Sequence, residues 1–234
     1  MCESPKLIGM LMKTPILPLL FLAATATLLP AAKPDSLEMK DTGEIAVLTD
    51  SLGGIQIGLR VTKITEEGAH LSVDPRQKTT PTSGAEVAAE VPYTLPDGSQ
   101  IVVSEKAAIE QSKVTLKGSW PNETQAKGYV VFVLKIPGEL ADNLTVEADG
   151  KPIFANFDKA SFLNKLKDLV FRKTSTGEFL FKLEGETDIV GGLRFDEEKH
   201  DNGIVIDVHV NPSPGANANL SEATETAWTL SFKE

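Results

Sequence analysis

Most of the chain alternates between apolar and polar side chains, the pattern of β-strands that bury one face. Ile55, Ile57, Leu59 and Val61 show this alternation clearly, and it recurs as far as the C-terminus. The segments that we expect to form such strands are Ile55–Val61, Leu71–Val73, Val87–Leu95, Gln100–Ser104, Lys113–Trp120, Leu144–Ala148, Pro152–Phe157, Phe179–Leu183, Leu193–Phe195, Ile204–Val210 and Trp228–Phe232.

One segment is continuously apolar instead of alternating. Tyr129–Leu134 carries no polar side chain apart from the tyrosine hydroxyl, and the strand extends to Ile136. A strand with a solvated face would not carry so many apolar residues, so we expect this one at the centre of a sheet, buried on both faces. Asp149-Gly150, between two strand-like segments, predicts a tight hairpin.

A single segment has the three- and four-residue spacing of a helix. Asp158 is placed to cap a helix, and we expect that helix over Lys159–Lys167. The apolar residues that give this spacing are Phe162, Leu163, Leu166, Leu169 and Val170.

Many short strands separated by turns are typical of sandwiches and barrels. We therefore predict an all-β fold: an antiparallel β-sandwich, jelly-roll-like or immunoglobulin-like, with one short helix. The domain is expected over residues 44–234, after a flexible lead-in at 27–43. Two smaller β units divided near 121–127 are the alternative.

The first 26 residues have the order of an export signal. Lys13 precedes the apolar run Ile16–Ala24, and Ala24-Thr25-Ala26 is a small-x-small cleavage sequence. The run is short and contains Pro18, so it does not predict a stable membrane span. We expect cleavage after Ala26 and a secreted or periplasmic, extracytoplasmic product.

Charge and cysteine content exclude several classes of function. The chain has 23 basic and 33 acidic side chains, a net charge of −10, which disfavours binding to nucleic acid or anionic membranes. The only cysteine, Cys2, lies in the leader, so the acidic mature chain is expected to be cysteine-free. Disulfides, thiol nucleophiles and cysteine-bound metals are thereby excluded from it.

Acidic side chains provide the candidates for catalysis. Glu184, Glu186 and Asp188 alternate, and on a regular strand they would share one face, as the paired carboxylates of a glycoside hydrolase must. The alternative is a solvent-facing strand edge. Asp207 and His209 also lie two residues apart, but the chain has no His-x-His or His-Glu-x-x-His arrangement.

An acidic segment between two expected strands is the candidate metal site. Asp196, Glu198 and Asp201 concentrate carboxylate oxygens of the kind that calcium prefers, although their spacing is not that of an EF-hand. The alternative is a solvated turn closed by Asn202-Gly203. Calcium is the one cofactor that the sequence suggests.

One aromatic side chain is the candidate for ligand binding. Trp120 ends an expected strand and precedes the polar segment Pro121–Thr124, where an indole ring could stack on a sugar. The alternative is that it closes the core. No Gly-x-Ser-x-Gly elbow or phosphate-binding glycine loop occurs.

These observations favour binding over catalysis. The leading hypothesis is an exported non-catalytic module that binds a glycan or another envelope or extracellular component, or has a structural role. The alternatives are a carbohydrate-active hydrolase or lyase with paired carboxylates, and a protein-interaction or assembly subunit.

Expression of the full chain in an exporting bacterium tests the leader. We expect an extracytoplasmic product that begins at Thr27, because signal peptidase accepts the Ala24-Thr25-Ala26 sequence. Intact mass spectrometry measures the new N-terminus. A cytosolic product that retains the leader would contradict the prediction.

Overall fold

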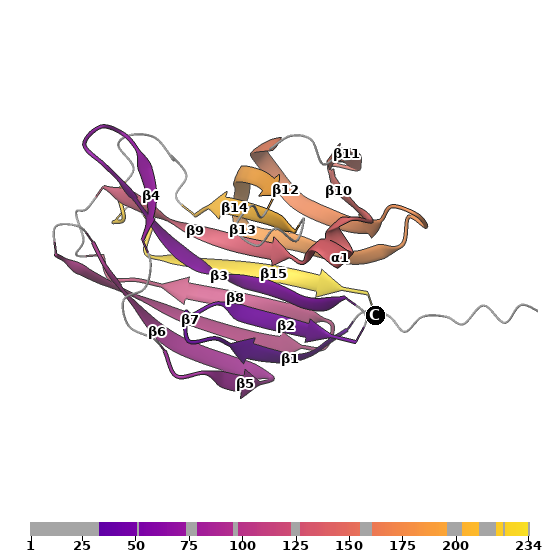
Figure 1. Cartoon of the computed structure of the whole chain (residues 1–234), viewed down its shortest axis with the longest axis horizontal. Helices are drawn as coiled ribbons and strands as arrows, with labels where there is room; N and C mark the ends of the chain where they lie inside the picture. The colour runs from indigo at the N-terminus through magenta and orange to yellow at the C-terminus, as the bar shows by residue number, and fades with distance from the viewer. Residues whose placement is uncertain are drawn as a thin grey trace, which may run out of the picture.

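The computed structural model describes residues 33–50, 52–73, 79–95, 98–122, 127–154, 161–195, 203–210, 219–221 and 223–233. Almost all of the described secondary structure is antiparallel strand (Figure 1). The elements are β1 Pro34–Met39, β2 Ile45–Thr49, β3 Gly53–Ile64, β4 His70–Val73, β5 Thr82–Gly84, β6 Glu86–Thr94, β7 Gln100–Glu110, β8 Lys113–Ser119, β9 Gly128–Ile136, α1 Gly138–Ala141, β10 Leu144–Ala148, β11 Lys151–Phe154, β12 Ser161–Lys173, β13 Phe179–Phe195, β14 Ile204–His209 and β15 Glu225–Phe232.

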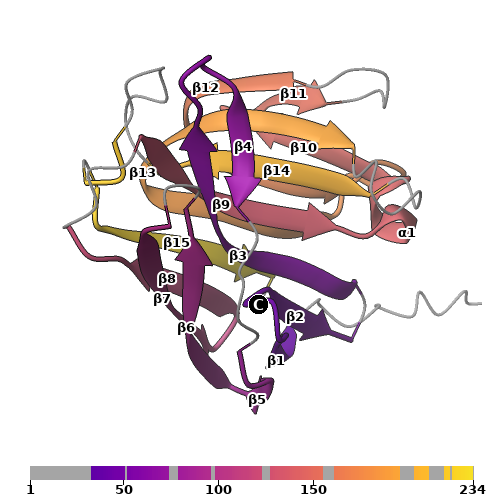
Figure 2. The same cartoon turned by 60° about the vertical axis from the view of Figure 1, so that its left-hand side comes forward.

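These strands form one curled sheet, in the order β5-β1-β2-β3-β9-β14-β13-β15-β8-β7-β6. The two ends of this order meet, because only Ala85 separates β5 from β6 along the chain. β5 pairs with β1 while β6 pairs with β7, so the sheet is nearly closed and barrel-like (Figure 2). The prediction of an all-β antiparallel fold is confirmed at this level. The strands β9, β14, β13 and β15, which follow 121–127 in the chain, lie between two groups of strands that precede it.

Two long strands change partners along their length. β3 pairs with β9 on one edge, and on the other edge first with β2 and then with β4. β13 pairs with β15 through Phe181–Gly185 and with β14 through Gly191–Phe195. Its other edge holds β12, from which β10 and β11 extend the sheet. This exchange of partners lets the sheet bend where a long strand passes from one neighbour to the next.

The interior of the curled sheet is the main hydrophobic core. Trp228 on β15 and Phe132 on β9 stack with ring centroids 4.9 Å apart, and both side chains are fully enclosed. β9 is buried on both faces, as its continuous apolar run predicts. Its outward side chains belong to a second, smaller apolar cluster made of Ile64, Tyr129, Val131, Val133 and Val205.

The hairpin expected at Asp149-Gly150 is confirmed. Ala148 pairs with Lys151, and the two turn residues have φ angles of 50° and 70°. Positive φ at both central positions is the signature of a type I′ turn, which suits the twist of a two-residue hairpin. The ordered domain begins earlier than expected, because Pro34–Met39 of the expected lead-in forms β1 and buries Leu37 and Met39.

The helix expected over Lys159–Lys167 is wrong. Residues 161–173 form strand β12, whose register against β13 shifts on both sides of Leu166. Lys165, with φ of 54°, marks the irregularity. Each shift moves the next inward residue by one position, so bulges give a strand the three-residue spacing of a helix. Asp158 and Lys159 lie outside the described residues. The only described helix is α1. It is not long and apolar enough to cross a membrane.

Gly185 tests the packing between β13 and β15. A Cβ at this position would lie 2.3 Å from a carbon of the buried Trp228 ring, which has no room to move. We expect Gly185→Ala to lower the free energy of unfolding by about 1–3 kcal/mol through overpacking. Denaturant unfolding measures the change.

Gly192→Ala on the same strand is the control, since no described atom lies within 4 Å of its Cβ position. Equal stabilities for the two variants would contradict the packing described for Gly185.

Candidate binding site

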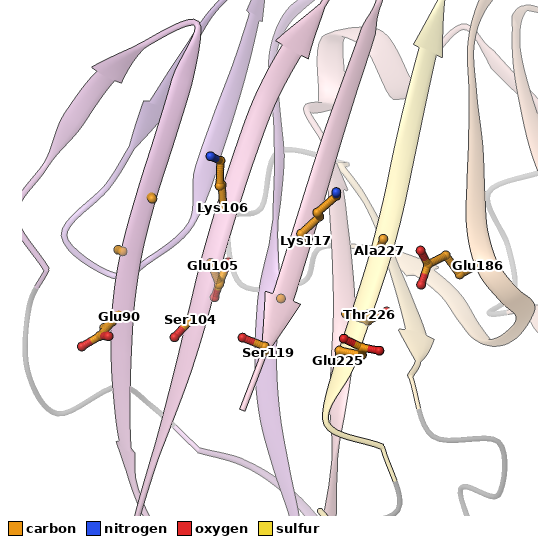
Figure 3. Close-up of a pocket in the computed structure, with 13 residues that line it drawn as sticks. Glu90, Ser104, Glu105, Lys106, Lys117, Ser119, Glu186, Glu225, Thr226 and Ala227 are labelled. Carbon is orange, nitrogen blue, oxygen red and sulfur yellow. The ribbon is translucent and has the colours of Figure 1, made fainter. Parts of the chain in front are cut away.

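A hollow lies on the outer face of the sheet, across β6, β7, β8 and β15 (Figure 3). It has a volume of ≈ 730 Å³, within the range of small-molecule sites. Its side chains come from outward positions of neighbouring strands. They combine small side chains, such as alanine and serine, with charged ones. We call this hollow the outer groove; it is lined by Ala88, Ala89, Glu90, Ser104, Glu105, Lys106, Lys117, Gly118, Ser119, Glu186, Glu225, Thr226 and Ala227.

Strand register arranges the outward residues of the outer groove in two parallel rows. Successive pairings across the four strands define each row. The first row is Ala88, Lys106, Lys117 and Ala227, and the second is Glu90, Ser104, Ser119 and Glu225. Alanine and serine occupy half of these positions, which is why the face is hollowed.

The two lysines of the first row face each other directly across β7 and β8. Like charges in this position destabilise an antiparallel pair, so some other interaction is needed to balance them. Lys106 has an ion pair with Glu86 at 2.8 Å, with both side chains more than half exposed. Among the described residues, Lys117 has no ion pair. Its ammonium group is therefore available to a ligand.

Glutamates stand at the ends of the outer groove. Glu90 and Glu225 belong to the same row but are three strand spacings apart, about 14 Å. Glu186 on β13 lies beyond Ala227 (Figure 3). A catalytic pair of glycosidase carboxylates needs a separation of about 5–10 Å, so Glu90 and Glu225 do not form one.

The three carboxylates singled out in the sequence do not gather at one place. Lys182 Nζ donates to Glu184 Oε1 at 2.6 Å, and Lys167 forms an ion pair with Asp188. Only Glu186 lines the outer groove. Between the pairs Asp168–Glu184 and Leu166–Ile189, β13 advances by five residues while β12 advances by two, so the stretch with the three acids has no regular pairing with β12.

Trp120 is packed into the core. Its side chain is 4% exposed, and its Nε1 donates to the carbonyl oxygen of Leu220 at 3.0 Å. Neither face of the ring is open to a sugar. None of the described residues that line the outer groove is aromatic, so a glycan there would be held by hydrogen bonds and charge instead of ring stacking.

The candidate calcium ligands Asp196, Glu198 and Asp201 lie outside the described residues. Within the described ranges, no group of three or more histidine, cysteine or acidic side chains is placed to hold a metal ion. Asp207 accepts from Arg194 Nε at 3.1 Å, and the His209 ring lies 4.7 Å from that of Tyr129. Both residues thus take part in contacts on the outer face of β14.

Sequence reasoning missed a buried acid, Glu105 on β7. It is 2% exposed and lies between the inward-facing Val103 and Ala107. The alternation that begins at Ile101 continues through position 105 and places this residue on the inward face. An acid at an inward position is the sequence signal that could have revealed the buried carboxylate. The expected strand ends at Ser104, six residues before the end of β7 and just short of Glu105.

The Glu105 carboxylate reaches across the interior to the opposite wall. Its Oε2 accepts a hydrogen bond from the backbone N–H of Leu59 at 3.3 Å. Oε1 is buried and has no hydrogen-bond partner among the described residues. Burial, only partly offset by the Leu59 hydrogen bond and reinforced by the charge of Glu44, raises the pKa of Glu105 to about 8. The carboxyl group is therefore largely protonated at neutral pH.

Sequence comparisons identify no relative from which a function could be transferred. No protein-family model matches the chain, and no curated protein matches it significantly. Function is therefore inferred from the geometry of the described residues.

The pKa of Glu105 predicts how stability changes with pH. The group binds its proton more tightly in the folded protein, with a pKa of about 8, than in the unfolded chain, with a pKa near 4.5. Its contribution to stability is thus complete below pH 4.5 and is lost as the pH rises through 8. Between these values the free energy of unfolding should fall by up to about 1.4 kcal/mol per pH unit.

We expect Glu105→Gln to flatten this dependence, because the amide keeps an acceptor for Leu59 but has no charge to bury. Denaturant unfolding at several pH values between 5 and 8.5 compares the variant with the wild type. Parallel curves would show that Glu105 ionises normally in the folded protein.

Proposed function

We propose that this protein is an exported, non-catalytic binding module that holds a glycan in the outer groove. The observation that supports the proposal best is the pair of facing lysines, Lys106 and Lys117, flanked by the small side chains of Ala88 and Ala227. The leader supports export, and a layered β-sheet module of jelly-roll-like or immunoglobulin-like type is the architecture that we propose.

The chemistry of the outer groove favours a sugar that carries an acidic group. Lys117 offers an ammonium group to a carboxylate or sulfate, and the hydroxyls of Ser104 and Ser119 match sugar hydroxyls. Glu90 and Glu225 can accept hydrogen bonds from further hydroxyls. Their charges also disfavour a ligand with closely spaced negative groups, such as nucleic acid.

Charge compensation supports this choice of ligand. Among the described residues, the only ion-pair partner of the facing lysines is Glu86, which reaches Lys106. An anionic substituent between the two ammonium groups would relieve their repulsion. Its contribution to the binding free energy should therefore be larger than that of the same contact at an isolated lysine. A neutral glycan would lack this contribution.

A carbohydrate-active hydrolase is the alternative. Glu186 and Glu225 both line the outer groove, and they are the acids that such an enzyme would use there. Reducing-sugar release, measured on the same sample as glycan binding, separates the two functions. Product formation that is lost in Glu186→Gln would support the hydrolase.

Lys117 provides the test of glycan binding. A glycan array that includes uronate-containing and sulfated oligosaccharides identifies the ligand, and titration calorimetry measures its affinity. We expect Lys117→Gln to weaken binding about 10-fold or more, since a hydrogen bond to a charged group contributes about 1.5–3 kcal/mol.

Lys113→Gln is the matched control. Lys113 lies on the outward face of the same strand but does not line the outer groove. We expect it to bind as the wild type does. The proposal fails if no immobilised glycan gives a signal, or if both lysine variants lose affinity equally.

A further inference from the structure

A second hollow lies where β3 has no neighbouring strand on one edge. β2 pairs with β3 up to Ile57, and β4 pairs with it from Val61 onward. Between these two segments, side chains provide hydrogen bonds to the backbone of Leu59. Glu105 accepts from its N–H, and the Tyr93 hydroxyl donates to its carbonyl oxygen at 2.9 Å. No strand is needed at this edge, and the space beside it stays open.

This hollow, which we call the β3 hollow, has a volume of ≈ 300 Å³. It opens over Gly58, whose missing side chain leaves room between Glu44 and Val133. The residues that line it are Thr42, Glu44, Gln56, Ile57, Gly58, Leu59, Arg60, Val73, Tyr93, Val133 and Lys135. None of them lines the outer groove, so an inference about the β3 hollow does not depend on the proposed glycan binding.

Charges in the β3 hollow leave one cation without a close acidic partner. Lys135 Nζ donates to Glu44 Oε1 at 2.6 Å, and the Lys135 side chain is 14% exposed. Burial opposes the ionisation of Glu44, but the hydrogen bond and charge of Lys135, with the charges of Lys40 and Arg60, lower its pKa overall. Glu44 and Lys135 therefore neutralise each other. Within the described part of the chain, Arg60 has no carboxylate at ion-pair distance.

A buried acceptor in the β3 hollow also lacks a donor. Gln56 Oε1 is enclosed and has no hydrogen-bond partner among the described residues. A buried polar atom without a partner is costly to the folded protein, so a molecule that supplies a donor would be bound favourably. Gln56 and Arg60 project from the same face of β3, on either side of Gly58.

We propose that the β3 hollow is a second binding site, for a small carboxylate whose neighbouring substituent donates a hydrogen bond. The carboxylate would contact Arg60, and the donor would contact Gln56 Oε1. Hydroxy acids and amino acids share this chemistry. The volume suits a molecule of about a dozen non-hydrogen atoms, for which ligand efficiency sets a Kd on the order of 1 mM.

Titration calorimetry with three probes tests the site. D-gluconate represents hydroxy acids, L-glutamine represents amino acids, and D-sorbitol has the hydroxyls of gluconate without its carboxylate. We expect gluconate or glutamine to bind with a Kd on the order of 1 mM, and sorbitol to bind at least about 10-fold more weakly because it cannot pair with Arg60. The acid that binds shows whether the ligand is a hydroxy acid or an amino acid.

Gly58→Val closes the site, and Gly192→Val is its matched control. The Cβ position of Gly58 meets only ordinary contacts, the nearest at 3.6 Å from Glu44 Cα, so the variant should fold. Gly192 has the equivalent outward position three strands away, where no described atom lies within 4 Å. We expect Gly58→Val to abolish binding and Gly192→Val to leave it unchanged.

Arg60→Gln gives a second reading if Gly58→Val is unstable, as thermal unfolding would reveal. Loss of the guanidinium charge should weaken binding of the acid about 10-fold or more. The proposal is overturned if neither acid binds the wild type, if sorbitol binds as well as gluconate, or if Arg60→Gln binds as the wild type does.

Discussion

The fold depends on satisfying the backbone of Leu59, on an edge of β3 that no strand covers. A buried N–H or carbonyl without a partner would cost about as much as a lost hydrogen bond. Glu105 and Tyr93 supply the partners from β7 and β6, strands on the opposite wall of the curled sheet. The two walls can approach this closely because Gly118, beside Glu105, has no side chain: a Cβ there would lie 2.0 Å from Leu59 Cδ1. Both hollows adjoin this contact, one on each wall.

The two hollows show how an acidic protein can present local positive charge. The net charge of −10 sets the average potential around the molecule, but a ligand responds to the nearest groups. Lys117 in the outer groove and Arg60 in the β3 hollow are cations without an ion pair among the described residues. Acidic neighbours limit the field of each to a short range, which favours small or sparsely charged ligands over polyanions.

Alternation of side chains predicted the strands well, because a sheet with one buried face imposes a period of two wherever it is regular. The unbroken run of β9 likewise predicted burial on both faces. Where the register shifts, the period is lost, and β12 was taken for a helix for that reason. The candidate site could not be predicted from the sequence, because Ala88, Lys106, Lys117 and Ala227 become neighbours only through the register of four strands. Glu105 alone could have been found, by following β7 one residue further.

The direct passage from β5 to β6 determines the overall form of the molecule. Residues on one side of Ala85 hold β1, and those on the other side hold β7, so this single stretch of chain works as a seam. Among the described strands none pairs with the outer edge of β6, so the seam joins the two borders of the sheet through the chain itself and not through hydrogen bonds. Such borders are templates for pairing with other chains. Because the seam keeps the border at β6 beside β1 and β5, it also restricts the access of another chain to that border.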